Sequence, residues 1–137
     1  MTLNEFCAVF DFRYIKLVEI YDIDDGYLFQ DIEGTSATYP AVFLNYLKHK
    51  PELGELRVLQ ANTVVAEHIR IITMSNTGIK PEYETAEEYA NRIWGKKETN
   101  KHKEFYEKVK KMFDQYSAEI GWEYIKRDPQ YWNWLDN

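Results

Sequence analysis

Six acidic side chains lie close together between residues 19 and 33, with no Lys or Arg among them. They are Glu19, Asp22, Asp24, Asp25, Asp31 and Glu33. A dense group of carboxylates can contact a basic surface on another protein, or compete with nucleic-acid phosphates for the same Lys and Arg side chains. The alternative is that these acids are ordinary turn residues on a solvated surface. The segment is therefore either a partner-binding surface or a solvated turn.

Calcium binding is the metal chemistry that such a segment could support. Asp22, Asp24 and Glu33 fall at positions 1, 3 and 12 of the count used by an EF-hand loop. That loop needs Gly at position 6, where this chain has Tyr27. The flanking residues are also typical of strands rather than helices. We therefore predict no metal site here.

A nucleophile would have to come from the one cysteine, Cys7. The histidines His49, His68 and His102 have no spacing typical of a metal site. Cys7 beside a histidine could act as a nucleophile, but a lone cysteine on an amphipathic helix is more typical of a small core residue. Gly-rich phosphate-binding motifs and zinc-protease motifs are missing. We expect neither an enzyme nor a cofactor, unless a pocket brings together Cys7, a histidine and a carboxylate.

A basic segment follows later in the chain, where seven lysines stand against three glutamates between residues 96 and 111. The lysines are Lys96, Lys97, Lys101, Lys103, Lys108, Lys110 and Lys111. Clustered lysines can bind nucleic-acid phosphates. Glu104 with Lys108 and Glu107 with Lys111 are spaced i, i+4, as in an ordinary solvated helix. A small nucleic-acid-binding regulator is the alternative function that this helix suggests.

Composition and charge restrict the function classes further. The chain has 137 residues, with 17 Lys and Arg against 23 Asp and Glu, and a net charge of -6. Its 45% hydrophobic and 16% aromatic content is that of a globular chain, and the acidic balance argues against a general DNA or RNA binder. One cysteine cannot form an internal disulfide, and we find neither a signal peptide nor an apolar run long enough for a membrane span. We therefore expect a cytoplasmic protein.

The first half of the chain reads as alternating helices and strands. Thr2 and Glu5 form a capping box for a short helix. Residues 13–33 read as a β-hairpin that turns at Asp24-Asp25-Gly26. Helical spacing follows over residues 39–47, and then come strands over 55–61 and 64–73, joined at Asn62-Thr63. This αββαββ order predicts an α+β fold in which helices cover one face of a four-stranded antiparallel sheet, over residues 1–76.

The second half reads as all helical from residue 81 onward. A capping box at Thr85 and Glu88 begins one helix, and a longer helix runs over residues 100–119 before Gly121 ends it. The tail, residues 122–137, is rich in Trp and Tyr. Such a tail either anchors an interface or packs onto the body, and we expect packing. Residues 81–137 are thus a helical extension that forms one compact domain with the body.

The segment from Leu17 to Gly34, LVEIYDIDDGYLFQDIEG, resembles hairpins of small phage and prophage proteins of unassigned function. Small acidic phage proteins include inhibitors of host defence, with anti-CRISPR proteins among them. The resemblance implies a non-catalytic inhibitor that binds a host protein with a basic, nucleic-acid-binding surface. We expect the acidic hairpin to make that contact.

Overall fold

The computed structural model of this chain describes residues 1–24, 26–28, 36–49, 51–75 and 99–136. Helix α1 (Leu3–Val9) begins the fold, and the predicted capping box is confirmed. The Thr2 hydroxyl accepts a hydrogen bond from the Glu5 N–H at 3.2 Å, and the Glu5 carboxylate accepts one from the Thr2 N–H at 2.9 Å. A 3-10 turn, η1 (Phe12–Tyr14), leads from this helix into the sheet.

Within the described residues, five strands form one mixed sheet. They are β1 (Leu17–Asp22), β2 (Gly26–Tyr27), β3 (Ala37–Thr38), β4 (Arg57–Val65) and β5 (His68–Met74). The order is β2-β1-β5-β4, and β3 pairs with β1 beside β2. Strands β1 and β5 are parallel, from Leu17 opposite His68 to Asp22 opposite Thr73.

The α+β class is confirmed, but the predicted four-stranded antiparallel sheet is wrong. Each hairpin is antiparallel within itself, as expected. The hairpins meet through β1 and β5, however, because the chain crosses over the sheet between them, and a crossover makes neighbouring strands parallel. Within the hairpin predicted over residues 13–33, the returning strand comes after the turn. Its described part is the two-residue β2, and residues 29–35 lie outside the described residues.

The second hairpin turns four residues later than predicted. Strand β4 continues through Thr63-Val64-Val65, which are β-branched and favour extended backbone. The reversal falls at Ala66-Glu67, where Glu67 adopts a left-handed φ of 63°. The Glu67 carboxylate accepts a hydrogen bond from the Ala118 N–H at 3.2 Å, so the turn is tied to the C-terminal helices.

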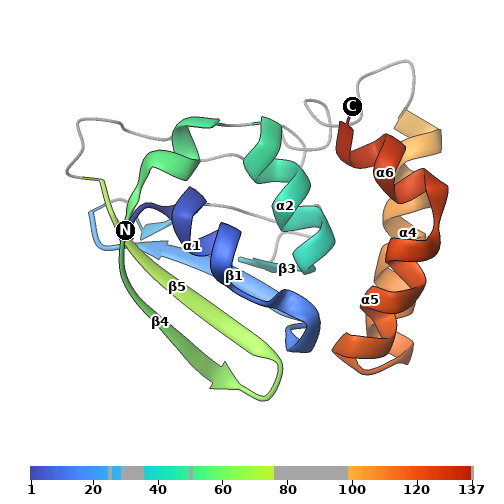
Figure 1. The fold of residues 1–137 in the computed structure, drawn as a ribbon, viewed down its shortest axis with the longest axis horizontal. Coiled ribbons are helices and arrows are strands. Elements are labelled where there is room, and N and C mark those ends of the chain that lie inside the picture. Colours follow the sequence, from blue (N-terminus) through green and yellow to red (C-terminus); the bar gives the residue numbers. More distant parts are fainter. Residues whose placement is uncertain (25, 29–35, 50, 76–98, 137) are drawn as a thin grey trace.

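The helices α1 and α2 (Pro40–His49) lie on one side of the sheet (Figure 1). A second 3-10 turn, η2 (Pro51–Glu55), connects α2 to β4. Alternate residues of the central strands point into the core that these helices cover. Val18, Ile20, Ile69 and Ile71 are buried there against Phe43 of α2.

Three helices of the described residues lie at the opposite end from β4, namely α4 (Thr99–Gln115), α5 (Ala118–Arg127) and α6 (Pro129–Asp136) (Figure 1). The predicted single helix over residues 100–119 is wrong, because α4 ends at Gln115. The prediction that Gly121 ends this helix is also wrong. Gly121 lies inside α5, where an added Cβ would stand 3.3 Å from the Phe113 ring. The glycine therefore lets α5 approach α4 closely.

Within the aromatic tail, Trp122 and Tyr131 are buried, and each is 3% exposed. Trp132 is half exposed. The helix predicted from Thr85 lies outside the described residues. One hydrophobic cluster contains residues of both the sheet layer and the C-terminal helices. None of the helices in the described ranges is long and apolar enough to cross a membrane.

Candidate functional site

Two of the six predicted contact acids, Glu19 and Asp22, are buried. Glu19 is 5% exposed and lies opposite Arg70 in the parallel register of β1 and β5. The Arg70 Nε–H donates to Glu19 Oε1 at 2.6 Å, and His68 Nε2 lies 3.5 Å from the same oxygen. This hydrogen bond raises the pKa of Arg70 above its ordinary value. Glu19 therefore joins β1 to β5 and is almost entirely covered.

Asp22 is fully buried and organises the turn that follows β1. Its carboxylate accepts hydrogen bonds from the Thr73 hydroxyl at 2.8 Å, the Ser75 hydroxyl at 2.7 Å and the Asp24 N–H at 3.1 Å. These bonds connect the end of β1 to the end of β5. The buried carboxylate is therefore hydrogen-bonded within the fold, as buried polar groups generally are.

Of the predicted contact acids within the described residues, Asp24 alone is exposed. Its carboxylate also accepts a hydrogen bond from the Ser75 N–H at 3.2 Å. The remaining predicted acids, Asp25, Asp31 and Glu33, lie outside the described residues. The described part of the hairpin is therefore less acidic on its surface than the sequence count implies.

The basic helix is also partly neutralised. The Lys108 ammonium binds the Asp128 carboxylate and donates to the Gln130 side chain at 3.0 Å, which joins α4 to α6. Burial acts to raise the pKa of Asp128, but the hydrogen bonds from Lys108 and the Gln130 N–H hold it below its ordinary value. Lys110 is half-buried and Lys111 is exposed. The side chains of Lys96, Lys97, Lys101 and Lys103 lie outside the described residues.

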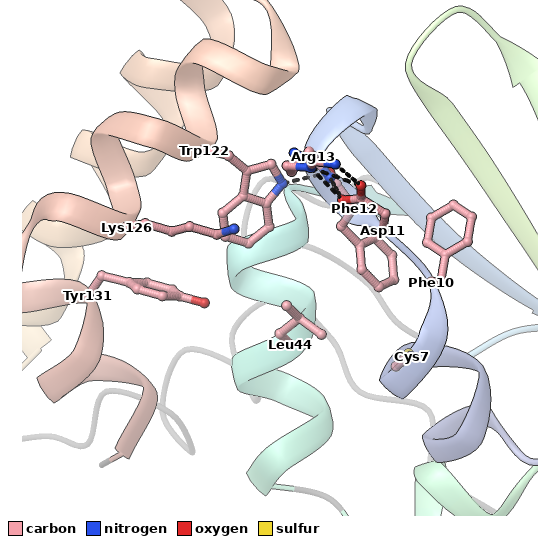
Figure 2. A pocket seen from close by; sticks show the side chains of 9 residues that line it. All are labelled: Cys7, Phe10, Asp11, Phe12, Arg13, Leu44, Trp122, Lys126 and Tyr131. Carbon is pink, nitrogen blue, oxygen red and sulfur yellow. Dashed lines mark hydrogen bonds and ion pairs between the residues drawn. The ribbon is translucent and has the colours of Figure 1, made fainter.

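A pocket of about 240 Å³ lies where α1, η1, α2, α5 and α6 meet (Figure 2). It is lined by Cys7, Phe10, Asp11, Phe12, Arg13, Leu44, Trp122, Lys126 and Tyr131. The Trp122 indole N–H donates to the Phe12 carbonyl at 2.7 Å, which fixes the ring as one wall. Sequence reasoning missed this pocket, because its residues come from segments more than 100 positions apart.

Cys7 and Asp11 both line the pocket, but no described histidine does. Burial raises the pKa of the Cys7 thiol to about 12, so the sulfur stays protonated at neutral pH. A protonated thiol is a poor nucleophile. His68 lies on β5, and the side chains of His49 and His102 are outside the described residues. The pocket therefore gives no support to a cysteine-histidine nucleophile pair.

Strand β4 lies at the edge of the sheet that the described residues form. At its start, the N-terminal segment pairs with it, because the Val58 N–H donates to the Met1 carbonyl and the Leu3 N–H to the Leu56 carbonyl, both at 2.8 Å. From Leu59 to Val65 no described residue pairs with this edge, and all seven residues are exposed. Leu59, Val64 and Val65 are 42%, 43% and 61% exposed. We call residues 59–65 the open edge.

Comparison with family models, curated proteins and solved structures finds no match for this chain. Function therefore has to be inferred from geometry. Two features of the described residues are candidates for a binding site, namely the open edge and the pocket. Within the same residues, no three metal-ligating side chains form a cluster that could hold an ion.

Proposed function

We propose that this protein is a non-catalytic protein-binding module that adds an extended segment of its partner to the open edge of β4. The observation that carries the proposal is the exposed outer edge at residues 59–65, which is unpaired within the described chain. An edge strand presents N–H and C=O groups that hydrogen-bond readily to another strand. Strand addition of this kind is a recurrent mode of peptide recognition.

The composition of the edge supports this reading. Residues 58–65, VLQANTVV, contain no charged residue and no proline. Soluble proteins usually protect a sheet edge with lysine, proline or a covering segment. Here the N-terminal segment covers only the first residues of β4.

Two irregularities in β4 shape the surface that a partner would meet. The register with β5 shifts between Val58 and Gln60 and again between Thr63 and Val65, which leaves Leu59 and Val64 as extra residues. Such bulges redirect side chains and often lie near binding sites. Both residues expose large apolar side chains, so they can make side-chain contacts beside the backbone ladder.

The partner segment that fits is an uncharged strand with basic residues on either side. Residues 58–65 carry no charge, so a partner strand that pairs with them needs no charged side chains. Basic residues on either side of that strand would be attracted by the net charge of -6. A second copy of this chain fits less well, because two molecules of the same charge repel each other.

The test is selection from a display library of random linear peptides, followed by hydrogen exchange on the full chain. We expect selected peptides to protect amides of β4 and to lose binding to the variant L59K/V64K, which places lysines on the edge. The matched control is Val9→Lys, which adds a lysine at another exposed valine, on α1. Peptides that protect other segments, or that bind L59K/V64K unchanged, would contradict the proposal. So would a dimer that L59K/V64K dissociates, because the edge would then serve self-association.

A narrower candidate is the phage-type inhibitor that contacts a basic host surface through its acidic hairpin. The exposed carboxylate of Asp24 at the hairpin turn favours it. Reversing the charge in D24K/D25K tests it on a candidate host protein. Loss of binding, together with loss of its salt dependence, supports the contact, and unchanged binding rejects it. The nucleic-acid alternative is weaker, because Asp128 neutralises Lys108.

A further inference from the structure

We propose that the pocket between α1, η1, α2, α5 and α6 is a binding site for a small amphipathic carboxylate, a site separate from the open edge. Its apolar and aromatic wall comes from Phe10, Phe12, Leu44 and Trp122, and charged or polar side chains line the rest. Figure 2 shows Lys126 and Tyr131 reaching into the same space from α5 and α6. An apolar body with one anionic group matches this combination.

The charges around the pocket favour an anionic ligand. Arg13 and Asp11 neutralise each other, with nitrogen-oxygen contacts of 2.7 to 3.1 Å. The hydrogen bonds from Arg13 lower the pKa of Asp11, so this carboxylate stays ionised and paired. Lys126 lies 5.4 Å from the centre of the Trp122 ring and forms no close ion pair with a carboxylate of the described residues, although its charge contributes to the lowered pKa of Asp11. One positive charge therefore remains at the pocket.

Tyr131 supplies a neutral hydrogen-bond donor beside that charge. Its side chain is 3% exposed, and burial raises the pKa of its hydroxyl to about 12, so the hydroxyl keeps its proton at neutral pH. The described residues show no hydrogen bond from this hydroxyl. A ligand carboxylate can accept from the Lys126 ammonium and the Tyr131 hydroxyl while its body contacts Leu44 and Phe10.

The size of the pocket limits the ligand. A volume of 240 Å³ equals the space of about eight water molecules in the liquid. A monocarboxylate with one ring or a short alkyl chain therefore fills it, and phenylacetate is a suitable probe. For a ligand of this size we expect a Kd on the order of 0.1–1 mM.

The test is a titration of the full chain with phenylacetate, followed by NMR of its backbone and indole N–H groups. We expect shifts at the Trp122 indole and the Cys7 amide, and weaker binding as salt is added. Phenylacetamide has the same shape without the charge, and it should bind at least about fivefold more weakly. Lys126→Gln should weaken phenylacetate binding by a similar factor, while Lys111→Gln, at an exposed lysine of α4, should leave it unchanged.

Three results would overturn this inference. They are equal affinity for phenylacetate and phenylacetamide, unchanged binding to Lys126→Gln, and no shift at about 10 mM phenylacetate. Tyr131→Phe keeps the ring but removes the donor, so it should weaken binding without unfolding the chain. None of these experiments involves β4, so their failure would leave the proposal for the open edge standing.

Discussion

Single side chains in this protein have roles that their type alone does not reveal. Glu19 and Asp22 belong to an acidic run in the sequence. In the structure, however, Glu19 pairs with Arg70, and the Asp22 carboxylate accepts three hydrogen bonds. Whether a strand carboxylate is buried and paired depends on which strand lies beside it. That neighbour is β5, about 50 residues away, so burial of these acids could not be read from local sequence.

Asp22 should be among the most sensitive positions to substitution. Asp22→Ala leaves the Thr73 and Ser75 hydroxyls and the Asp24 N–H without this acceptor, and we expect it to lower the free energy of unfolding by about 2–4 kcal/mol. Asp22→Asn keeps one acceptor oxygen and should cost less. Asp24→Ala, at the exposed neighbour, is the control and should change stability by only about 1 kcal/mol or less, because its carboxylate accepts one exposed hydrogen bond from the Ser75 N–H. Urea denaturation measures all three, and equal effects at Asp22 and Asp24 would contradict the structural role.

Among the elements, those specified by neighbouring residues could be predicted, and those specified by distant contacts could not. The capping box, the β-hairpins and helix α2 depend on residues close in the chain, and they were predicted with shifted boundaries. The parallel pairing of β1 with β5 and the packing of α5 on α4 depend on tertiary contacts. Gly121 illustrates the difference, because a glycine after a periodic run is a common helix stop. Here the close approach of Phe113 explains it instead.

The packing of α5 on α4 can be tested at Gly121. Gly121→Leu places a side chain against the Phe113 ring and should lower the free energy of unfolding by about 1–3 kcal/mol, despite the better helix propensity of leucine. Glu119→Leu introduces the same residue at an exposed position of α5, so it serves as the control and should retain or gain stability. Thermal unfolding followed by circular dichroism compares the two. A Gly121→Leu variant as stable as Glu119→Leu would show that α5 and α4 are not in close contact there.

At the scale of the whole molecule, the sheet layer and the C-terminal helices share one hydrophobic cluster, which includes Val18 and Phe43 as well as Phe113 and Trp122. We therefore expect a single cooperative unfolding transition. All four tryptophans lie between residues 94 and 134, so their fluorescence reports the C-terminal part. Hydrogen exchange of β1 and β5 amides reports the sheet. Coincident transitions would support one domain, and an earlier fluorescence transition would show that the extension unfolds separately.

The stability of the whole molecule should also fall at alkaline pH, because two ionisable groups are buried between its layers. Cys7 and Tyr131 line the pocket, and burial raises the pKa of each to about 12, from ordinary values of 9.0 and 10.0. Above about pH 9 the unfolded chain releases these protons while the folded chain retains them, so stability decreases as pH rises. Below that pH their contribution is fully present.

Urea denaturation at a series of pH values measures this loss. The variant C7A/Y131F, which removes both ionisations, is the comparison, and its stability should fall less steeply between about pH 9 and 12. The other tyrosines and the lysines give the same background in both proteins, so the difference between the two slopes isolates the buried pair. Equal slopes would mean that water reaches both groups. The C-terminal helices would then pack more loosely against α1 and α2 than the 3% exposure of Tyr131 indicates.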